Sequence, residues 1–148
     1  MNLLCTLFSI GCLVLRSLGV GGATLSGAAS VHDGDTLYIQ PSPSGFGRTS
    51  NRQAIRLAGI DAEELDEPNG YAAKAHLILL IRGRPVTCAL DGWSYQRRVG
   101  TCTAGSDSLN ARMVADGYAL DCAYYSKGIY ATLEPSGVRQ RLRSKPYC

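Results

Sequence analysis

The residues of this chain that could do chemistry begin with four acids in two short segments. Asp33 and Asp35 lie in the sequence VHDGDT, and Asp61 and Glu64 lie at the end of the apolar run IRLAGIDAEE. Hard cations such as calcium bind where carboxylates converge from different parts of a chain, together with backbone carbonyls and water. An EF-hand loop is excluded, because no run of alternating acids has the spacing that this loop requires. Asp-Gly is also a common turn dipeptide, so a purely structural hairpin turn is the alternative for the first segment.

Two arginines could hold an anion beside these acids. Arg56 lies inside the apolar run, where an unpaired guanidinium would be costly, so its side chain should face an acid or an anion. Arg97 lies in the sequence WSYQRR, which we expect to form a loop between two strands. A guanidinium suits phosphate because its fork donates two parallel hydrogen bonds and stays charged. A structural salt bridge for Arg56 and a solvated loop position for Arg97 or Arg98 are the alternatives.

The elements that must position these residues are strands for the most part. Alternating apolar residues predict about five of them, at residues 24–31, 36–39, 53–60, 85–90 and 99–103. The acids of HDGD lie in the turn between the first two strands, and Asp91 and Gly92 form a turn between the last two. Residues 40–52 are rich in Pro, Ser and Gly and should form a loop.

Helices should follow the acids. The Ala- and Leu-rich residues 70–81 predict one helix, and a second should begin at a cap among Ser106, Asp107 and Ser108 and stop at Gly117. Residues 126–134 could form a third, which Pro135 and Gly137 would end. The order of elements predicts an α+β domain, a five-stranded β-barrel compatible with the OB-fold, with about two to three packed helices.

Length and charge agree with a single domain that binds ions of both signs. The chain has 148 residues, enough for one domain with a proper core. Its formal net charge is +3, yet seven of its twelve acids fall within residues 33–67, while basic residues crowd the end at Arg139, Arg141, Arg143 and Lys145. A local acidic cluster in a mildly basic protein is typical of a cation site that faces an anionic ligand.

The N-terminal segment differs from the rest of the chain. Residues 3–15 are almost uninterrupted apolar residues, followed by Arg16 and the small residues 19–23. This pattern predicts a secretory signal over residues 1–22, followed by one domain over residues 23–148, and hence a secreted or periplasmic protein. An uncleaved anchor, a misassigned start or a buried helix is the alternative. The protein would contact a membrane only through this segment, if it stays uncleaved.

The cysteines agree with export. Removing the leader leaves an even set, Cys88, Cys102, Cys122 and Cys148. Cys88 and Cys102 lie in consecutive predicted strands, so a cross-strand disulfide is the first choice of pairing, with Cys122–Cys148 as the second. The spacings match no compact zinc signature.

Four segments together resemble the signature of the staphylococcal nuclease family. VHDGDT, IRLAGIDAEE, YQR at residues 95–97 followed by VGTC, and SLNARMVADGYAL occur in the family's order across residues 31–130. The resemblance implies an OB-fold barrel with packed helices. It also implies a calcium-dependent phosphodiesterase that cleaves DNA and RNA with little sequence preference. We expect a monomer without a stable protein partner.

The resemblance also implies a role for each candidate site residue. Asp35 and Asp61 match the family's calcium ligands, with the carbonyl of Ala62 as a further ligand and Asp33 in the outer shell. Glu64 matches the acid that activates the attacking water. The two arginines that hold the scissile phosphate match Arg56 and Arg97. Apart from the resemblance, Tyr95, Tyr118 and Tyr124 could stack on bases or line the rim of the site, and a place in the core is the alternative for these aromatic residues.

The sequence departs from the family pattern at four places. Glu63 stands where proline is usual, so the loop that carries Glu64 loses a rigid element and gains a negative charge. Gln96 replaces a glycine, residues 40–52 are longer than in many members, and Pro135 and Gly137 interrupt the last helix. None of these changes removes a catalytic residue. A non-catalytic OB-fold module that binds nucleic acid is the alternative function, followed by a small exported protein whose acids are structural.

Overall fold

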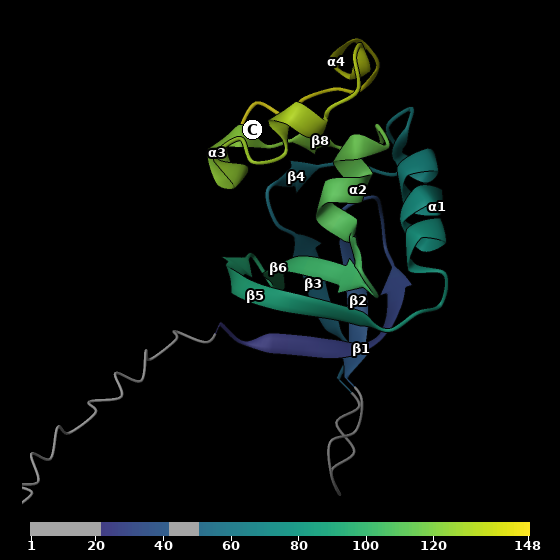
Figure 1. Ribbon diagram of the computed structural model, residues 1–148, viewed down its shortest axis with the longest axis vertical. Helices are drawn as coiled ribbons and strands as arrows, with labels where there is room; N and C mark the ends of the chain where they lie inside the picture. The colour runs from purple at the N-terminus through teal and green to yellow at the C-terminus, as the bar shows by residue number, and fades with distance from the viewer. Residues whose placement is uncertain (1–21, 42–50) are drawn as a thin grey trace, which may run out of the picture.

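The computed structural model describes residues 22–41 and 51–148 (Figure 1). Almost all of the predicted leader and most of the predicted loop at residues 40–52 lie outside these ranges. Within them, no helix is both long enough and apolar enough to cross a membrane.

Five strands close into a mixed barrel. They are β1 (Thr24–Val31), β2 (Thr36–Pro41), β3 (Gln53–Leu57), β5 (Val86–Ser94) and β6 (Arg97–Ala104). The hydrogen-bonded order is β3-β2-β1-β5-β6, and a parallel pairing of β3 with β6 closes the ring. The α+β class and the five-stranded barrel predicted from the sequence are therefore confirmed.

Short strands and helices extend this barrel at one end (Figure 1). The short strand β4 (Ile60–Asp61) pairs with β8 (Leu120–Asp121), and β7 (Asp107–Ser108) pairs with β6. The helices are α1 (Gly70–Ile81), α2 (Leu109–Ala115), α3 (Ala123–Ser126), the 3-10 turn η1 (Ala131–Leu133) and α4 (Val138–Arg141). In Figure 1 the C-terminus lies beside α3.

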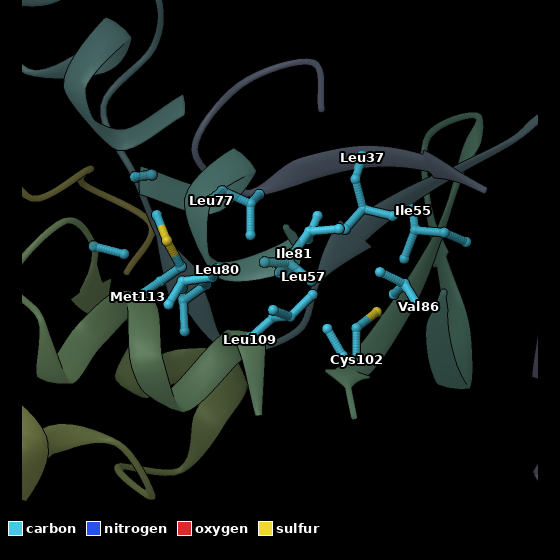
Figure 2. Close-up of a cluster of buried hydrophobic side chains, with 14 of the residues drawn as sticks. Leu37, Ile55, Leu57, Leu77, Leu80, Ile81, Val86, Cys102, Leu109 and Met113 are labelled. Atoms are coloured by element: carbon cyan, nitrogen blue, oxygen red, sulfur yellow. The ribbon is translucent and has the colours of Figure 1, made fainter. Parts of the chain in front are cut away.

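The core fills the space between the barrel and the first two helices. Figure 2 shows Leu77 of α1 and Leu109 and Met113 of α2 among side chains from the strands. Helix α1 has the predicted bounds, and Ser108 is the cap of α2, because its side chain accepts a hydrogen bond from the Ala111 N–H. Packing of these apolar faces fixes both helices on the barrel.

Two predictions about the chain after α1 were wrong. Asp91 and Gly92 do not form the turn, because β5 continues to Ser94 with a register shift between Leu90 and Trp93. A glycine at positive φ can serve either a bulge or a turn, and Gly92 (φ 75°) serves the irregularity. The turn falls at Tyr95 and Gln96, so Arg97 begins β6 and does not lie in a loop.

The predicted third helix was also wrong in its extent. Residues 126–134 contain no continuous helix, because Lys127 and Gly128 both adopt positive φ after the single turn of α3. A 3-10 turn follows separately. Positive φ at two successive residues ends a right-handed helix.

Both predicted disulfides are present. Cys88 and Cys102 are opposite each other on β5 and β6, with 4.1 Å between their Cα atoms. Cys122 joins Cys148, 4.4 Å apart, and so ties the end of the chain to the start of α3. Disulfides are typical of proteins in an extracellular or otherwise oxidising location.

Candidate active site

Three of the four candidate acids, Asp33, Asp35 and Asp61, converge from two segments of the chain. Asp33 and Asp35 lie in the turn between β1 and β2, and Asp61 lies in β4. The Ala62 N–H donates to Asp35 Oδ2 at 2.9 Å, and the Leu57 N–H donates to the Asp35 carbonyl at 2.8 Å. These bonds lock the first turn against the chain that follows β3.

Gly34 makes this close approach possible. A Cβ at this position would lie 2.6 Å from the Cβ of Ala62 and 2.6 Å from the Cβ of Ala73 on α1. No side chain fits at such distances, so only glycine lets the turn pack against both the acidic loop and the helix. The Asp-Gly dipeptide therefore does more here than form a turn.

Arg56 on β3 faces the acids, as the cost of an unpaired buried guanidinium requires. Its Nη1 lies 2.5 Å from Asp35 Oδ2, and its Nη2 lies 3.7 Å from Asp61 Oδ1. The pairing of Thr36 with Arg56 between β2 and β3 sets this position. One guanidinium thus neutralises part of a cluster that contains more carboxylates than cations.

Two carboxylates of this cluster, Asp35 and Asp61, are hard to ionise. Asp33, Asp35 and Asp61 are at most 6% exposed. Burial raises the pKa of Asp35 to about 7, against the opposing effect of Arg56 and with a further increase from Asp33. Burial also raises the pKa of Asp61, which Arg56 opposes. A site in this state favours an additional cation.

The oxygen atoms at this site fit a hard cation. Among the described residues, Asp61 Oδ1 accepts no hydrogen bond although it is buried. Calcium takes carboxylates together with carbonyls and water, so Asp35, Asp61 and the Ala62 carbonyl form a chemically suitable set. Asp33 accepts a bond from the Asp35 N–H at 3.0 Å and so supports the turn. The described chain has no group of three or more His, Cys, Asp or Glu side chains arranged around one metal position.

Glu64 is exposed on the loop that follows β4, next to the buried Glu63. The Glu63 carboxylate accepts hydrogen bonds from the Asn69 N–H at 2.7 Å, the Asn69 side chain at 3.0 Å and the Arg143 N–H at 3.0 Å. These bonds offset the loss of the rigid proline expected from the sequence. The extra negative charge is buried and hydrogen-bonded, and it does not face the site freely.

The C-terminal tail, residues 143–148, contacts the same loop. The Lys145 N–H donates to Asp61 Oδ2 at 3.4 Å, and its ammonium contacts Glu67 at 2.6 Å. Sequence reasoning missed these contacts. The signal that could have found them is the Cys122–Cys148 pair, since Cys122 follows β8, the partner of β4.

A pocket of about 750 Å³ is connected to the acids through Arg56, which lines it and contacts Asp35, while none of the four candidate acids lines it. Arg56 and Arg97 both line it, so the structure brings the two predicted arginines to one cavity. Arg97 also donates to the Thr36 hydroxyl at 2.9 Å, which fixes it beside the acidic turn. The aromatic residues that line the pocket are Trp93, Tyr95, Tyr125 and Tyr147.

The predicted aromatic residues are only partly brought together. Tyr95 lines the pocket, whereas Tyr118 stacks on His76 with 4.0 Å between ring centroids. Tyr124 does not line the pocket, but its neighbour Tyr125 does. Tyr147 was missed by the sequence prediction. Burial raises the pKa of Tyr147, and the Asp61 charge raises it further, so its phenol stays protonated at neutral pH.

The protein has a closed five-stranded barrel with packed helices, and two arginines line a pocket next to its acidic cluster. These features place it in the α+β class of nuclease-like OB-fold proteins. The family description that matches the chain is Staphylococcal nuclease homologue, over residues 54–136. This match covers more than half of the sequence, and the chain belongs to this family. No curated protein matches it. Arg56, Asp61, Glu64 and Arg97 fall inside the matched span, and Asp33 and Asp35 precede it.

Proposed function

We propose that this protein is a calcium-dependent nuclease that hydrolyses phosphodiester bonds of DNA and RNA with little sequence preference. The observation that carries the proposal is the position of Arg56. This side chain contacts Asp35, lies near Asp61 and shares a pocket with Arg97. An anion held by the two guanidiniums would therefore lie beside the carboxylates suited to a cation. Membership of a nuclease family supports nucleic acid as that anion.

In this proposal Arg56 and Arg97 bind oxygen atoms of the scissile phosphate and stabilise the charge that grows on them during attack. Glu64 positions a water molecule and accepts its proton, and exposure at the edge of the site gives its carboxylate access to solvent. Asp35, Asp61 and the Ala62 carbonyl would hold calcium, with Asp33 in the outer shell. Bound calcium would supply further positive charge for the phosphate.

The proposed cellular location follows from the leader and the disulfides. We infer that residues 1–22 direct the chain out of the cytoplasm and that residues 23–148 form the secreted or periplasmic domain. Two disulfides in a domain of this size support an oxidising compartment. We expect the domain to act as a monomer on DNA and RNA.

The test is an assay of purified protein on single- and double-stranded DNA and on RNA, with calcium or with a chelator. We expect cleavage that requires calcium and that Glu64→Gln abolishes. Asp66→Asn is the matched control, because Asp66 is an exposed acid of the same loop, and this variant should keep its activity. Absence of calcium-dependent cleavage would contradict the proposal. Binding of nucleic acid without cleavage at any divalent ion would support the non-catalytic OB-fold module.

A further inference from the structure

We propose that Tyr147 contacts the nucleobase of a bound nucleotide, and that the Cys122–Cys148 disulfide holds it in position to do so. This inference rests on the proposed function for the chemistry of the ligand. It adds a base contact from the C-terminal tail to the phosphate contacts of the two arginines.

The pocket has room and chemistry for more than a phosphate group. At about 750 Å³ it has the size of a site for a small organic ligand. Its two cations, Arg56 and Arg97, share the lining with four aromatic side chains. Aromatic rings bind nucleobases by stacking, whatever the base, while guanidiniums bind the phosphate. A nucleotide matches both parts of this lining.

Tyr147 has a ring face available for such a contact. Two of the other aromatic residues already have partners, since Trp93 lies under Arg98 at 4.8 Å and Tyr125 meets Tyr124 edge to face at 4.9 Å. No ring contact within the described part of the chain involves Tyr147, which is 53% exposed although it lines the pocket. Half of its surface is therefore open to a ligand.

The tail is fixed on both sides of Tyr147. On one side, the Lys145 ammonium contacts Glu67 at 2.6 Å. On the other side, Cys148 is bonded to Cys122, and its carbonyl accepts a hydrogen bond from the Tyr124 N–H at 3.3 Å. Figure 1 places this end of the chain beside α3. A tyrosine between two fixed residues, Lys145 and Cys148, loses little further freedom when a base binds, which favours affinity.

Loss of the disulfide should therefore weaken the binding of only one part of the ligand, the nucleobase. Without the bond to Cys122, the Lys145–Glu67 ion pair still holds the tail before Tyr147, but Cys148 keeps only backbone hydrogen bonds, and Tyr147 leaves its place in the pocket. Arg56 and Arg97 are on β3 and β6 of the barrel and keep their positions. Base binding should weaken while phosphate binding persists.

The experiment measures, by calorimetry in calcium, the affinity of the full protein for two probes. One is a deoxynucleoside 3′,5′-bisphosphate and the other is the abasic deoxyribose 3′,5′-bisphosphate. We expect Tyr147→Leu to lower the affinity for the nucleoside probe about tenfold and to leave the affinity for the abasic probe unchanged. Tyr147→Phe should restore affinity, because the ring alone stacks. The double variant Cys122→Ser with Cys148→Ser should behave like Tyr147→Leu.

The matched control is Tyr71→Leu, because Tyr71 is an exposed tyrosine on α1 that does not line the pocket. This variant should bind both probes as the wild type does. If Tyr147→Leu lowers the affinity for both probes equally, or for neither, the role of Tyr147 is overturned and the nuclease proposal still stands. Failure of the wild type to bind either probe would overturn both.

Discussion

Glu63 should stabilise the fold, and its neighbour Glu64 should act in catalysis. The same substitution should therefore lower the free energy of unfolding at Glu63 and the nuclease activity at Glu64. Glu63 is 3% exposed, and both of its carboxylate oxygens accept backbone hydrogen bonds, from Asn69 and from Arg143. In Glu63→Gln one oxygen can still accept the Asn69 bonds. The amide NH₂ then faces the Arg143 N–H, where two donors meet. The tail contact is lost.

The size of this effect follows from the bonds. Hydrogen bonds to a charged group contribute about 1.5–3 kcal/mol each, and an unsatisfied buried donor costs about 1–3 kcal/mol. We expect Glu63→Gln to lower the free energy of unfolding by about 2–3 kcal/mol. Urea unfolding at pH 7, with both disulfides intact, measures this difference. The midpoint of thermal unfolding should fall by about 6–10 °C.

The effect of Glu63→Gln should also depend on pH. Burial opposes ionisation of Glu63, but the hydrogen bonds from Asn69 and Arg143 outweigh it and lower the pKa below its usual value of 4.5. A carboxyl with a lowered pKa stabilises the folded state fully above its unfolded-state pKa, and this contribution is lost as the pH falls through the folded-state pKa. The difference between wild type and variant should therefore shrink below pH 4.5.

Glu64→Gln is the control for this experiment. The Glu64 side chain is exposed, and the hydrogen bond to Glu67 comes from its backbone N–H and not from its carboxylate. The free energy of unfolding of this variant should therefore lie within about 0.5 kcal/mol of the wild-type value. Glu64→Gln should lose nuclease activity, whereas Glu63→Gln should lose only part of it well below its melting temperature, because the Asn69 bonds still hold the loop. An unfolding free energy of Glu63→Gln within about 0.5 kcal/mol of the wild type would refute the role assigned to this carboxylate.

Two further predictions concern the charges at the site. Arg97→Lys should lower kcat/KM on DNA about 100-fold in steady-state assays, because lysine cannot replace the guanidinium fork. Arg98→Lys is the matched control, because Arg98 does not line the pocket. An equal loss of kcat/KM in both variants would contradict the role assigned to Arg97. Calcium affinity should weaken about tenfold per pH unit below pH 7, because the metal must displace a proton from Asp35, whose pKa is about 7. Calorimetric titration from pH 8 to about pH 5 checks this, and a flat profile would show that Asp35 does not bind the ion.

The fold and the acidic cluster could be predicted because local patterns carry them. Alternating apolar residues define the strands, and the position of the acids at strand ends brings Asp35 and Asp61 together once the barrel closes. The bounds of α1 follow from a run of strong helix formers that ends before Gly83. The path of β5 could not be predicted, because Gly92 gives the same signal for a bulge as for a turn. A turn at Asp91 and Gly92 would leave Arg97 in a loop, whereas the continued strand puts it at the start of β6.

The tail contacts could not be predicted from local patterns. Residues 143–148 are polar or basic for the most part and have no apolar period, so nothing in the segment itself fixes a position. Its place is set by partners far away in sequence, through the Glu63 carboxylate and the Cys122 disulfide. Tyr147 was missed as a pocket residue because its neighbours in space are distant in sequence.

The tail contacts also change the meaning of the glutamate that replaces proline at position 63. A proline stiffens a loop by restricting its own backbone, and this local effect needs no partner. Glu63 instead accepts bonds from Asn69, at the N-terminus of α1, and from Arg143 in the tail. A carboxylate beside a helix N-terminus gains further stability from the helix dipole. In this chain the order of the loop that carries Glu64 therefore depends on long-range bonds. Release of the tail should loosen the catalytic loop together with the base contact.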